Sequence, residues 1–443
     1  MSLSVPVPPP TSSLRVVLFL VLLCPAFMCL NTRGSSDMLY WNTWADKVVR
    51  LGPVKGYEDI RRDYPPLASM TVGAAYWLGS KWGLDVTTSI KCALFLIYGV
   101  SLLVFWRLTR HYWATVLAAA GLLVHAVALG YLDIVYMSFL IGALTAFAAE
   151  RWMLFAILYA LTCLVKWQPL ILAPFFALHL SRQYLLTPQW KNGAALIAKK
   201  VVLPMAIILG ITLFIFGIKP VGAAFHMAFR GEDHRALSLQ ALNLPWVATH
   251  LIEWLMPNKF PEAGRNMGMA SLDQGEAQPL LLPSEGVHIL TRLPFILMYL
   301  FLLFRVWRSG LSPWKTIMGA MLGYFSYFML ATGVHENHLF TAVVLAMFLF
   351  ARGQLRLEYP VVLALIINAN LLMFYRLDGA KLHEGDRAFV RTLDPALLTA
   401  AANVIAYFCI VWSVIKLLPA REKSRDLSPL PSAEGASEAA LAR

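Results

Sequence analysis

The stretch SSDMLYWNTWADKVVRLGPVKGYEDIRRDYPPL, from Ser35 to Leu67, is a polar segment that carries several acids between two strongly apolar regions. A chain with few charges has few places for charged chemistry, and this stretch is the first of them. We therefore expect the apolar helices on either side to bring their few polar residues to meet this segment.

The composition is that of a membrane protein. The chain has 443 residues, of which 59% are hydrophobic and 14% are charged, whereas soluble domains average about 25% charged residues. Apolar runs of about 15–20 residues recur along the sequence, which predicts an all-α polytopic membrane protein. The net charge of +12 fits basic cytoplasmic loops and contacts with membrane lipids. The basic residues are scattered, so no nucleic-acid partner is expected.

The cysteines point to packing rather than to chemistry. Cys24, Cys29, Cys92, Cys163 and Cys409 all lie in apolar runs, and their spacing is not that of a metal site. They are expected to be small buried hydrophobic residues. The sequence contains no Asn-X-Ser/Thr acceptor site, which favours a bacterial membrane over the endoplasmic reticulum.

The distribution of Lys and Arg predicts about twelve spans with both termini inside. The decisive segment is 66–80, a short run that we interpret as a juxtamembrane or re-entrant helix. With that choice nearly every short basic loop falls on one side, as the positive-inside rule requires. The expected divisions are a disordered segment 1–13, a transmembrane domain 14–418 with external loops at 31–87 and 218–287, and a disordered cytoplasmic tail 419–443.

This topology puts the isolated polar residues of the apolar chain on the external side, most of them at helix ends. Ionisable groups that meet in one cavity at a membrane boundary are candidates for a functional site. The candidates are Asp37, Asp63, Tyr64, Asp133, Lys166, Gln168, Arg230, Arg235, His335 and Glu336.

Each candidate also has a structural interpretation. Asp37 could cap the amphipathic helix that follows it, and Asp133 could cap a helix at the water line. The Asp-Tyr-Pro-Pro turn at 63–66 could simply end a loop, because proline keeps the residue before it out of the helical region. The His-Glu-Asn-His turn at 335–338 could be a solvated connection between two spans.

The basic candidates have similar alternatives. Lys166 is the only charge between Arg151 and Arg182, and a buried ammonium group requires an anionic partner or ligand. Lys166 could instead extend to the membrane interface. Arg230 and Arg235 could hold a phosphate or belong to a solvated loop face.

The order of these motifs resembles that of the integral-membrane GT-C glycosyltransferases, over about residues 30–352. The resemblance is closest to bacterial mannosyltransferase-like members. It extends to the dolichyl-phosphate-glucose glucosyltransferases, which carry a similar Asp-Tyr-Pro-Pro and Val-His-Glu. The motifs are Asp37 in the first external loop, DYPPL at 63–67, LGYLD at 129–133, KWQPL at 166–170 and GVHENHLF at 333–340.

The resemblance implies a GT-C fold, a polyprenyl-phosphate sugar as donor and a glycan or lipid acceptor on the external face. It implies that Asp37 is the general base and that His335 and Glu336 lie near the donor. Lys166 matches a Lys-x-Gln-Pro motif loosely. Asp133 departs from the family, which commonly shows Trp-Gly-Gln before its acid. No cofactor is implied. The clustered external acids could hold a divalent metal, although no metal-ligand spacing supports one.

The chemistry of glycosyl transfer needs groups of these kinds. A carboxylate takes the proton of the acceptor hydroxyl, the anomeric carbon gains oxocarbenium character, and cationic groups stabilise the leaving phosphate. A single base opposite the leaving group predicts inversion. This chemistry and the resemblance together imply a hexosyltransferase of the mannose or glucose class, with its site facing the periplasm. The alternative is a transporter or flippase of lipid-linked saccharides, although the internal repeat typical of transporters is missing from the sequence.

Overall fold

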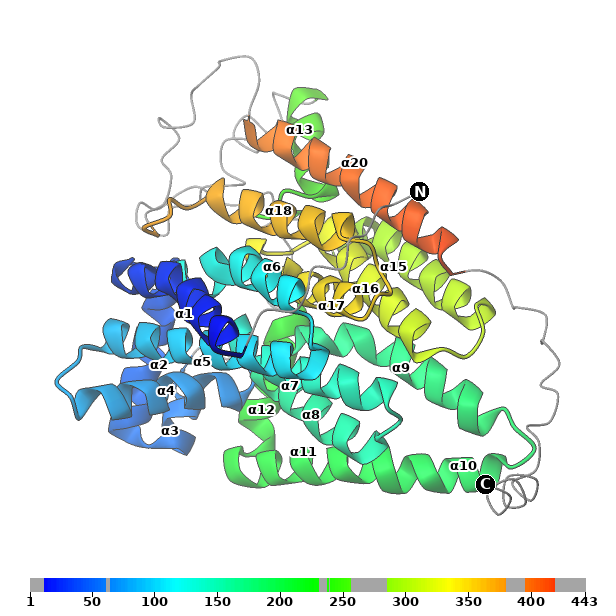
Figure 1. Ribbon diagram of the computed structural model, residues 1–443, viewed down its shortest axis with the longest axis horizontal. Coiled ribbons are helices and arrows are strands. Elements are labelled where there is room, and N and C mark those ends of the chain that lie inside the picture. The colour runs from blue at the N-terminus through cyan, green and yellow to red at the C-terminus, as the bar shows by residue number, and fades with distance from the viewer. Residues whose placement is uncertain are drawn as a thin grey trace, which may run out of the picture.

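The computed structural model describes residues 12–60, 64–230, 237–238, 240–255, 285–379 and 395–418. These residues form helices joined by turns (Figure 1), so the prediction of an all-α chain is confirmed for this part of the protein. Residues 1–11 and 419–443 of the predicted disordered termini lie outside the described residues. So do 231–236, 239 and 256–284 of the predicted external loop.

The helices follow one another with short connections. They are α1 (Ser12–Met28), α2 (Asp37–Leu51), α3 (Pro53–Glu58), α4 (Pro66–Ser80), α5 (Val86–Thr109), α6 (Tyr112–Leu123), α7 (Asp133–Ala148), α8 (Trp152–Val165), α9 (Ala173–Leu180), α10 (Trp190–Ile197), α11 (Leu203–Phe216), α12 (Ile218–Arg230), α13 (Leu244–Leu255), α15 (Glu285–Arg308), α16 (Pro313–Leu330), α17 (Phe340–Ala351), α18 (Glu358–Leu372) and α20 (Pro395–Lys416). Short 3-10 or π turns include η2 (Val124–Ala128), η3 (Gln168–Leu172) and η7 (Glu336–Leu339).

Four helices in the described part of the chain are long and apolar enough to cross a membrane. They are Val86–Thr109, Trp190–Phe216, Leu290–Arg308 and Pro395–Lys416. The other predicted spans correspond to shorter or less apolar helices. Of the roughly twelve predicted spans, only these four therefore correspond to helices in the described part of the chain that are long and apolar enough to cross a membrane.

Two predicted spans have a different form in the structure. The predicted span 201–217 is the second part of a helix that begins at Trp190 and continues through Lys199. Lys199 and Lys200 lie inside this helix and do not end it. The predicted span 168–181 starts as the 3-10 turn η3, because Pro169 stands at its beginning, and becomes α-helical only at Ala173.

The predicted first external loop contains α2, α3 and α4, and of these α2 and α4 pack beside α5 at one side of the bundle (Figure 1). Helix α2 buries Met38, Trp41, Ala45 and Val48, whose spacing of three and four residues gathers them on one face. Gly73 of α4 lies so close to the Val48 side chain that a Cβ would not fit there. The helices that follow Ser35 therefore form a packed layer and not an open loop.

Helix α17 is the innermost helix, since all its residues from Phe340 to Leu349 are buried. It contacts α16, α18, α6 and α7. In contrast, the helix of residues 190–216 exposes apolar side chains such as Ile211 and Phe214. An apolar surface of this kind on a long helix is typical of a helix that faces lipid.

Cysteine labelling should decide whether α4 crosses the membrane. In a cysteine-free background we expect Ser80→Cys to react with a membrane-impermeant maleimide added outside, because the predicted topology keeps α4 on the external face. Arg356→Cys should react only after permeabilisation. Both positions are exposed in the structure. Labelling of Ser80→Cys only from the inside would mean that α4 spans the membrane and that every later helix changes side.

Candidate active site

The start of the first loop is tied to the turn between α6 and α7 by main-chain contacts. The Ser35 amide donates to the Leu129 carbonyl at 2.7 Å, and the Trp41 indole donates to the Gly130 carbonyl at 3.1 Å. Gly34 and Gly130 both have positive φ, at 80° and 74°, which glycine adopts without steric cost. These contacts bring the first residues of α2 to the beginning of α7.

A buried lysine, which was not among the predicted site residues, donates hydrogen bonds to the end of η2 next to this turn. Lys91 lies in α5 and is fully buried. Its ammonium group donates to the Val127 and Ala128 carbonyls, at 2.5 Å and 2.7 Å, and to the Thr32 hydroxyl at 2.7 Å. These oxygens solvate the ammonium charge in place of water. Lys91 was recognisable in the sequence as the single charge between Asp85 and Arg107.

Two acids from distant parts of the chain meet around Tyr131. Its hydroxyl donates to Glu336 Oε1 at 2.5 Å, and Ser36 and Tyr375 share a hydrogen bond of 2.9 Å beside it. Burial raises the pKa of Tyr131 well above its usual value, and the negative charges of Glu336 and Asp37 raise it further. Tyr131 is therefore a protonated donor to Glu336, in the field of both carboxylates.

Asp37 is the first residue of α2 and is half-buried. The residue before the helix, Ser36, makes no capping bond, because its hydroxyl contacts Tyr375. A carboxylate in the first turn is stabilised by the helix dipole. Asp37 thus stands at the start of α2, next to the Ser36–Tyr375 contact.

The His-Glu-Asn-His turn is held from both sides. The Asn370 side chain donates to the Glu336 carbonyl at 3.1 Å and accepts from the Leu242 amide at 2.7 Å. His335 lies 3.8 Å from Glu336 Oε2 through its Nδ1 atom and is 41% exposed, whereas Glu336 is 5% exposed. Glu336 is therefore a fixed internal acid, and His335 is the neighbour that faces solvent.

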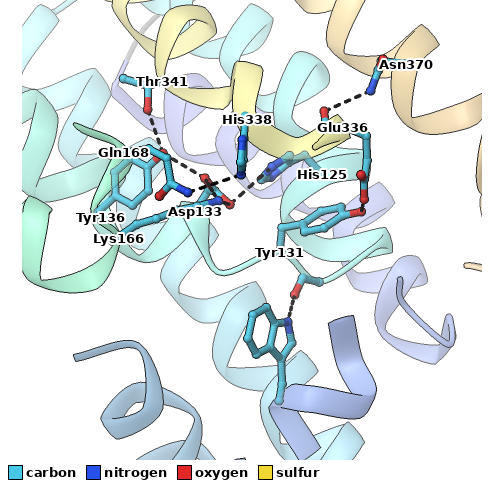
Figure 2. A network of polar contacts seen from close by, with 12 residues as sticks. His125, Tyr131, Asp133, Tyr136, Lys166, Gln168, Glu336, His338, Thr341 and Asn370 are labelled. Atoms are coloured by element: carbon cyan, nitrogen blue, oxygen red, sulfur yellow. Dashed lines mark hydrogen bonds and ion pairs between the residues drawn. The ribbon is translucent and has the colours of Figure 1, made fainter. Parts of the chain in front are cut away.

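Asp133 and Lys166 form a buried ion pair at the centre of the polar network (Figure 2). The Lys166 ammonium lies 2.9 Å from both carboxylate oxygens of Asp133, and the side chains are only 2% and 1% exposed. Tyr136 donates to Asp133 at 3.0 Å and shares a 2.9 Å hydrogen bond with Thr341. His125 Nε2 stands 3.8 Å from the same carboxylate. Asp133 is thus the anionic partner that a buried Lys166 requires.

Further aromatic and amide side chains lie around this ion pair. The Lys166 ammonium lies 5.5 Å from the centre of the Tyr64 ring, and that ring packs edge-on against Trp41 of α2 at 5.3 Å. On the other side, Gln168 and His338 are joined by a hydrogen bond of 3.4 Å. Figure 2 shows this hydrogen bond beside the Asp133–Lys166 pair.

The structure thus brings together seven of the ten predicted site residues: Asp37, Tyr64, Asp133, Lys166, Gln168, His335 and Glu336. Asp63 and Arg235 lie outside the described residues. Arg230 ends α12, but its side chain is likewise outside them. In the described ranges no three His, Cys, Asp or Glu side chains lie close enough together to hold a metal ion.

Several members of the network could not be recognised from the sequence. Tyr131, Tyr136, Tyr375 and His125 are aromatic residues in apolar surroundings, where packing is their ordinary role. Only Tyr131 carried a signal, because it lies inside the Leu-Gly-Tyr-Leu-Asp motif. Tyr136 and Tyr375 hydrogen-bond residues far away in the sequence, Thr341 and Ser36. His125 packs against the rings of Tyr131 and Phe340.

Fold and site together define an α-helical chain with membrane-spanning candidates and a polar centre shared by its first loop and late turn. Neither a family model nor a curated protein matches the chain. The chain is similar to the crystal structure of ArnT from Cupriavidus metallidurans bound to undecaprenyl phosphate. That match covers 92% of this chain and 74% of that one, with a TM-score of 0.45 and 15% sequence identity. A likeness at this level carries no statement about activity, so what this protein does is inferred from its own residues.

Proposed function

We propose that the protein is a membrane glycosyltransferase. It moves a hexose of the mannose or glucose class from a polyprenyl-phosphate sugar to a lipid-linked or cell-envelope acceptor, with inversion at the anomeric carbon. The reaction takes place on the external face of a bacterial cytoplasmic membrane. The observation that carries the proposal is that Asp37 and Glu336, which lie far apart in the sequence, are both close enough to Tyr131 to raise its pKa, and that Glu336 accepts its hydrogen bond.

In this proposal Asp37 is the general base. It accepts the proton of an acceptor hydroxyl as that oxygen forms a bond to the anomeric carbon, while the bond from that carbon to the phosphate oxygen breaks. The electron pair leaves with the phosphate. Glu336 accepts a short hydrogen bond from Tyr131, which makes it a poorer base than the half-buried Asp37. Its negative charge favours the oxocarbenium character of the transition state.

The remaining candidates are assigned to substrate binding. Tyr64 offers an aromatic face, and Gln168 has an amide at the wall of the site. Lys166 and Asp133 neutralise each other, so their proposed role is to fix this wall and to bind sugar hydroxyls at its surface. His335 is the exposed group beside Glu336 and can approach the donor. Asp63, Arg230 and Arg235 stay predictions from the sequence.

Transfer by the purified protein is the direct test. We expect radiolabelled hexose to pass from a polyprenyl-phosphate hexose to an acceptor, and the product linkage to be inverted because one base works opposite the leaving group. A nucleotide sugar should give no product, since the sequence has no nucleotide-binding motif. Binding of the donor with neither transfer nor donor hydrolysis would exclude the enzyme, and movement of intact donor across a vesicle membrane would identify a flippase.

A further inference from the structure

A cavity lies beside the polar network, between η3, α15 and α16. It measures about 150 Å³ and is lined by Trp167, Gln168, Arg292, Tyr327 and Thr332 together with apolar side chains. Tyr327 also hydrogen-bonds His338 at 3.3 Å, so the cavity adjoins the site through a shared wall. Water occupies about 30 Å³ per molecule in the liquid. The cavity therefore has room for a phosphate group.

Three buried polar atoms at this cavity have no hydrogen-bond partner among the described residues. They are Trp167 Nε1, Gln168 Oε1 and Thr332 Oγ1. Trp167 is 7% exposed and Thr332 is 2% exposed. Leaving such atoms unpaired is costly, and clusters of them need an explanation in terms of a ligand. Trp167 and Thr332 can donate hydrogen bonds, which suits an anionic ligand.

Arg292 supplies the positive charge. It lies in the membrane-spanning part of α15 and lines the cavity, and within the described residues no carboxylate is within ion-pair distance of it. A guanidinium group on an apolar helix needs an anionic partner, and its planar fork matches two phosphate oxygens. Lys166 cannot take this role, because Asp133 already neutralises it.

An apolar groove continues from the cavity along α15. It is lined by Leu170, Ile171, Phe295, Ile296, Tyr299 and Leu300, and two of these, Ile171 and Phe295, also line the cavity. The groove measures about 290 Å³. The face of α15 that borders it is exposed, with Ile296 at 38% and Leu300 at 56%. A hydrocarbon chain attached to an anion in the cavity would run out of the protein here.

We propose that this cavity and groove bind a lipid phosphate. Arg292 pairs with two phosphate oxygens, Trp167 and Thr332 donate hydrogen bonds to the phosphate, and an isoprenoid chain occupies the apolar groove. Gln168 Oε1 accepts from a hydroxyl of the group attached to the phosphate, on the side that faces His338. As the binding site of the donor this rests on the proposed function, but lipid-phosphate binding can be measured without any transfer.

The test compares Arg292→Gln with Arg308→Gln, a matched change at an exposed position of the same helix. In phosphatidylcholine nanodiscs we expect Arg292→Gln to bind a long-chain polyprenyl phosphate about 10- to 100-fold more weakly, because a charge-assisted pair is lost. Arg308→Gln should bind like the unchanged protein. Equal affinity of Arg292→Gln and the unchanged protein would overturn the assignment.

A second variant tests the groove and does not depend on the arginine. Ile296→Trp should fill the groove, so it should weaken binding of the long-chain phosphate while a short isoprenyl phosphate binds as before. Inorganic phosphate should compete only weakly, and competition as strong as that of the lipid would overturn the lipid assignment. If Arg292→Gln loses lipid-phosphate binding and the unchanged protein transfers no hexose, this inference holds and the proposed function is wrong. If the unchanged protein transfers hexose and Arg292→Gln binds the lipid phosphate normally, the proposed function holds and this inference is wrong.

Discussion

Replacing Asp37 by asparagine should lower the rate of hexose transfer about 100- to 10,000-fold, which is the contribution that a positioned general base makes to a proton-transfer step. Asparagine has the same shape as aspartate but cannot accept the proton of the acceptor hydroxyl. The donor should still bind, because the residues assigned to the donor lie on η3, α15 and η7. The loss should therefore fall on kcat and leave the affinity for the donor almost unchanged.

The measurement is single-turnover transfer from a radiolabelled donor, with donor binding followed in parallel. Asp46→Asn is the matched control, because Asp46 lies on the same helix, is 42% exposed and pairs only with Arg50 at the surface. It should transfer at nearly the normal rate. If Asp37→Asn keeps that rate as well, the base is another group, and Glu336 is then the next acid to replace.

The composition of the sequence predicted the fold class, but it did not predict how deeply each helix is buried in the bundle. Apolar runs predicted helices such as α5 and α17, because period and length are written in the sequence. They did not predict that α17 is buried on every side while residues 190–216 are exposed along one helix. An inner helix and a lipid-facing helix both consist of apolar residues, so hydropathy alone does not distinguish them.

The candidate site, too, could be predicted only in part from the sequence. Asp37, Asp133, Lys166 and Glu336 could be found because a charge in an apolar chain is rare and costly. Their partners could not, because the pairing of Tyr131 with Glu336 joins residues 205 positions apart and depends on how each helix is rotated. Arg292 was not singled out either, since a single arginine near a helix end resembles an ordinary interfacial residue.

Removing one member of the Asp133–Lys166 pair should destabilise the protein by about 3–5 kcal/mol, because the other charge is then buried without its partner. Asp133→Leu leaves the Lys166 ammonium against the Tyr64 ring, at 5.5 Å, with no carboxylate bound to it. Lys191→Met is the control: this lysine is exposed over the Trp190 ring, so its loss should cost less than about 0.5 kcal/mol. Thermal and denaturant unfolding in detergent micelles measure both.

The double variant Asp133→Leu/Lys166→Met separates a structural role of the pair from a role in binding. Replacing a whole buried ion pair by apolar side chains is often neutral for stability, so the double variant should recover most of what each single variant loses. The two changes would then be strongly non-additive, as expected for groups 2.9 Å apart. If the pair only holds η3 against α7, transfer should return together with stability. If the pair also binds sugar hydroxyls, the double variant should be stable and yet bind the donor sugar poorly, and this is the outcome that the proposed function requires.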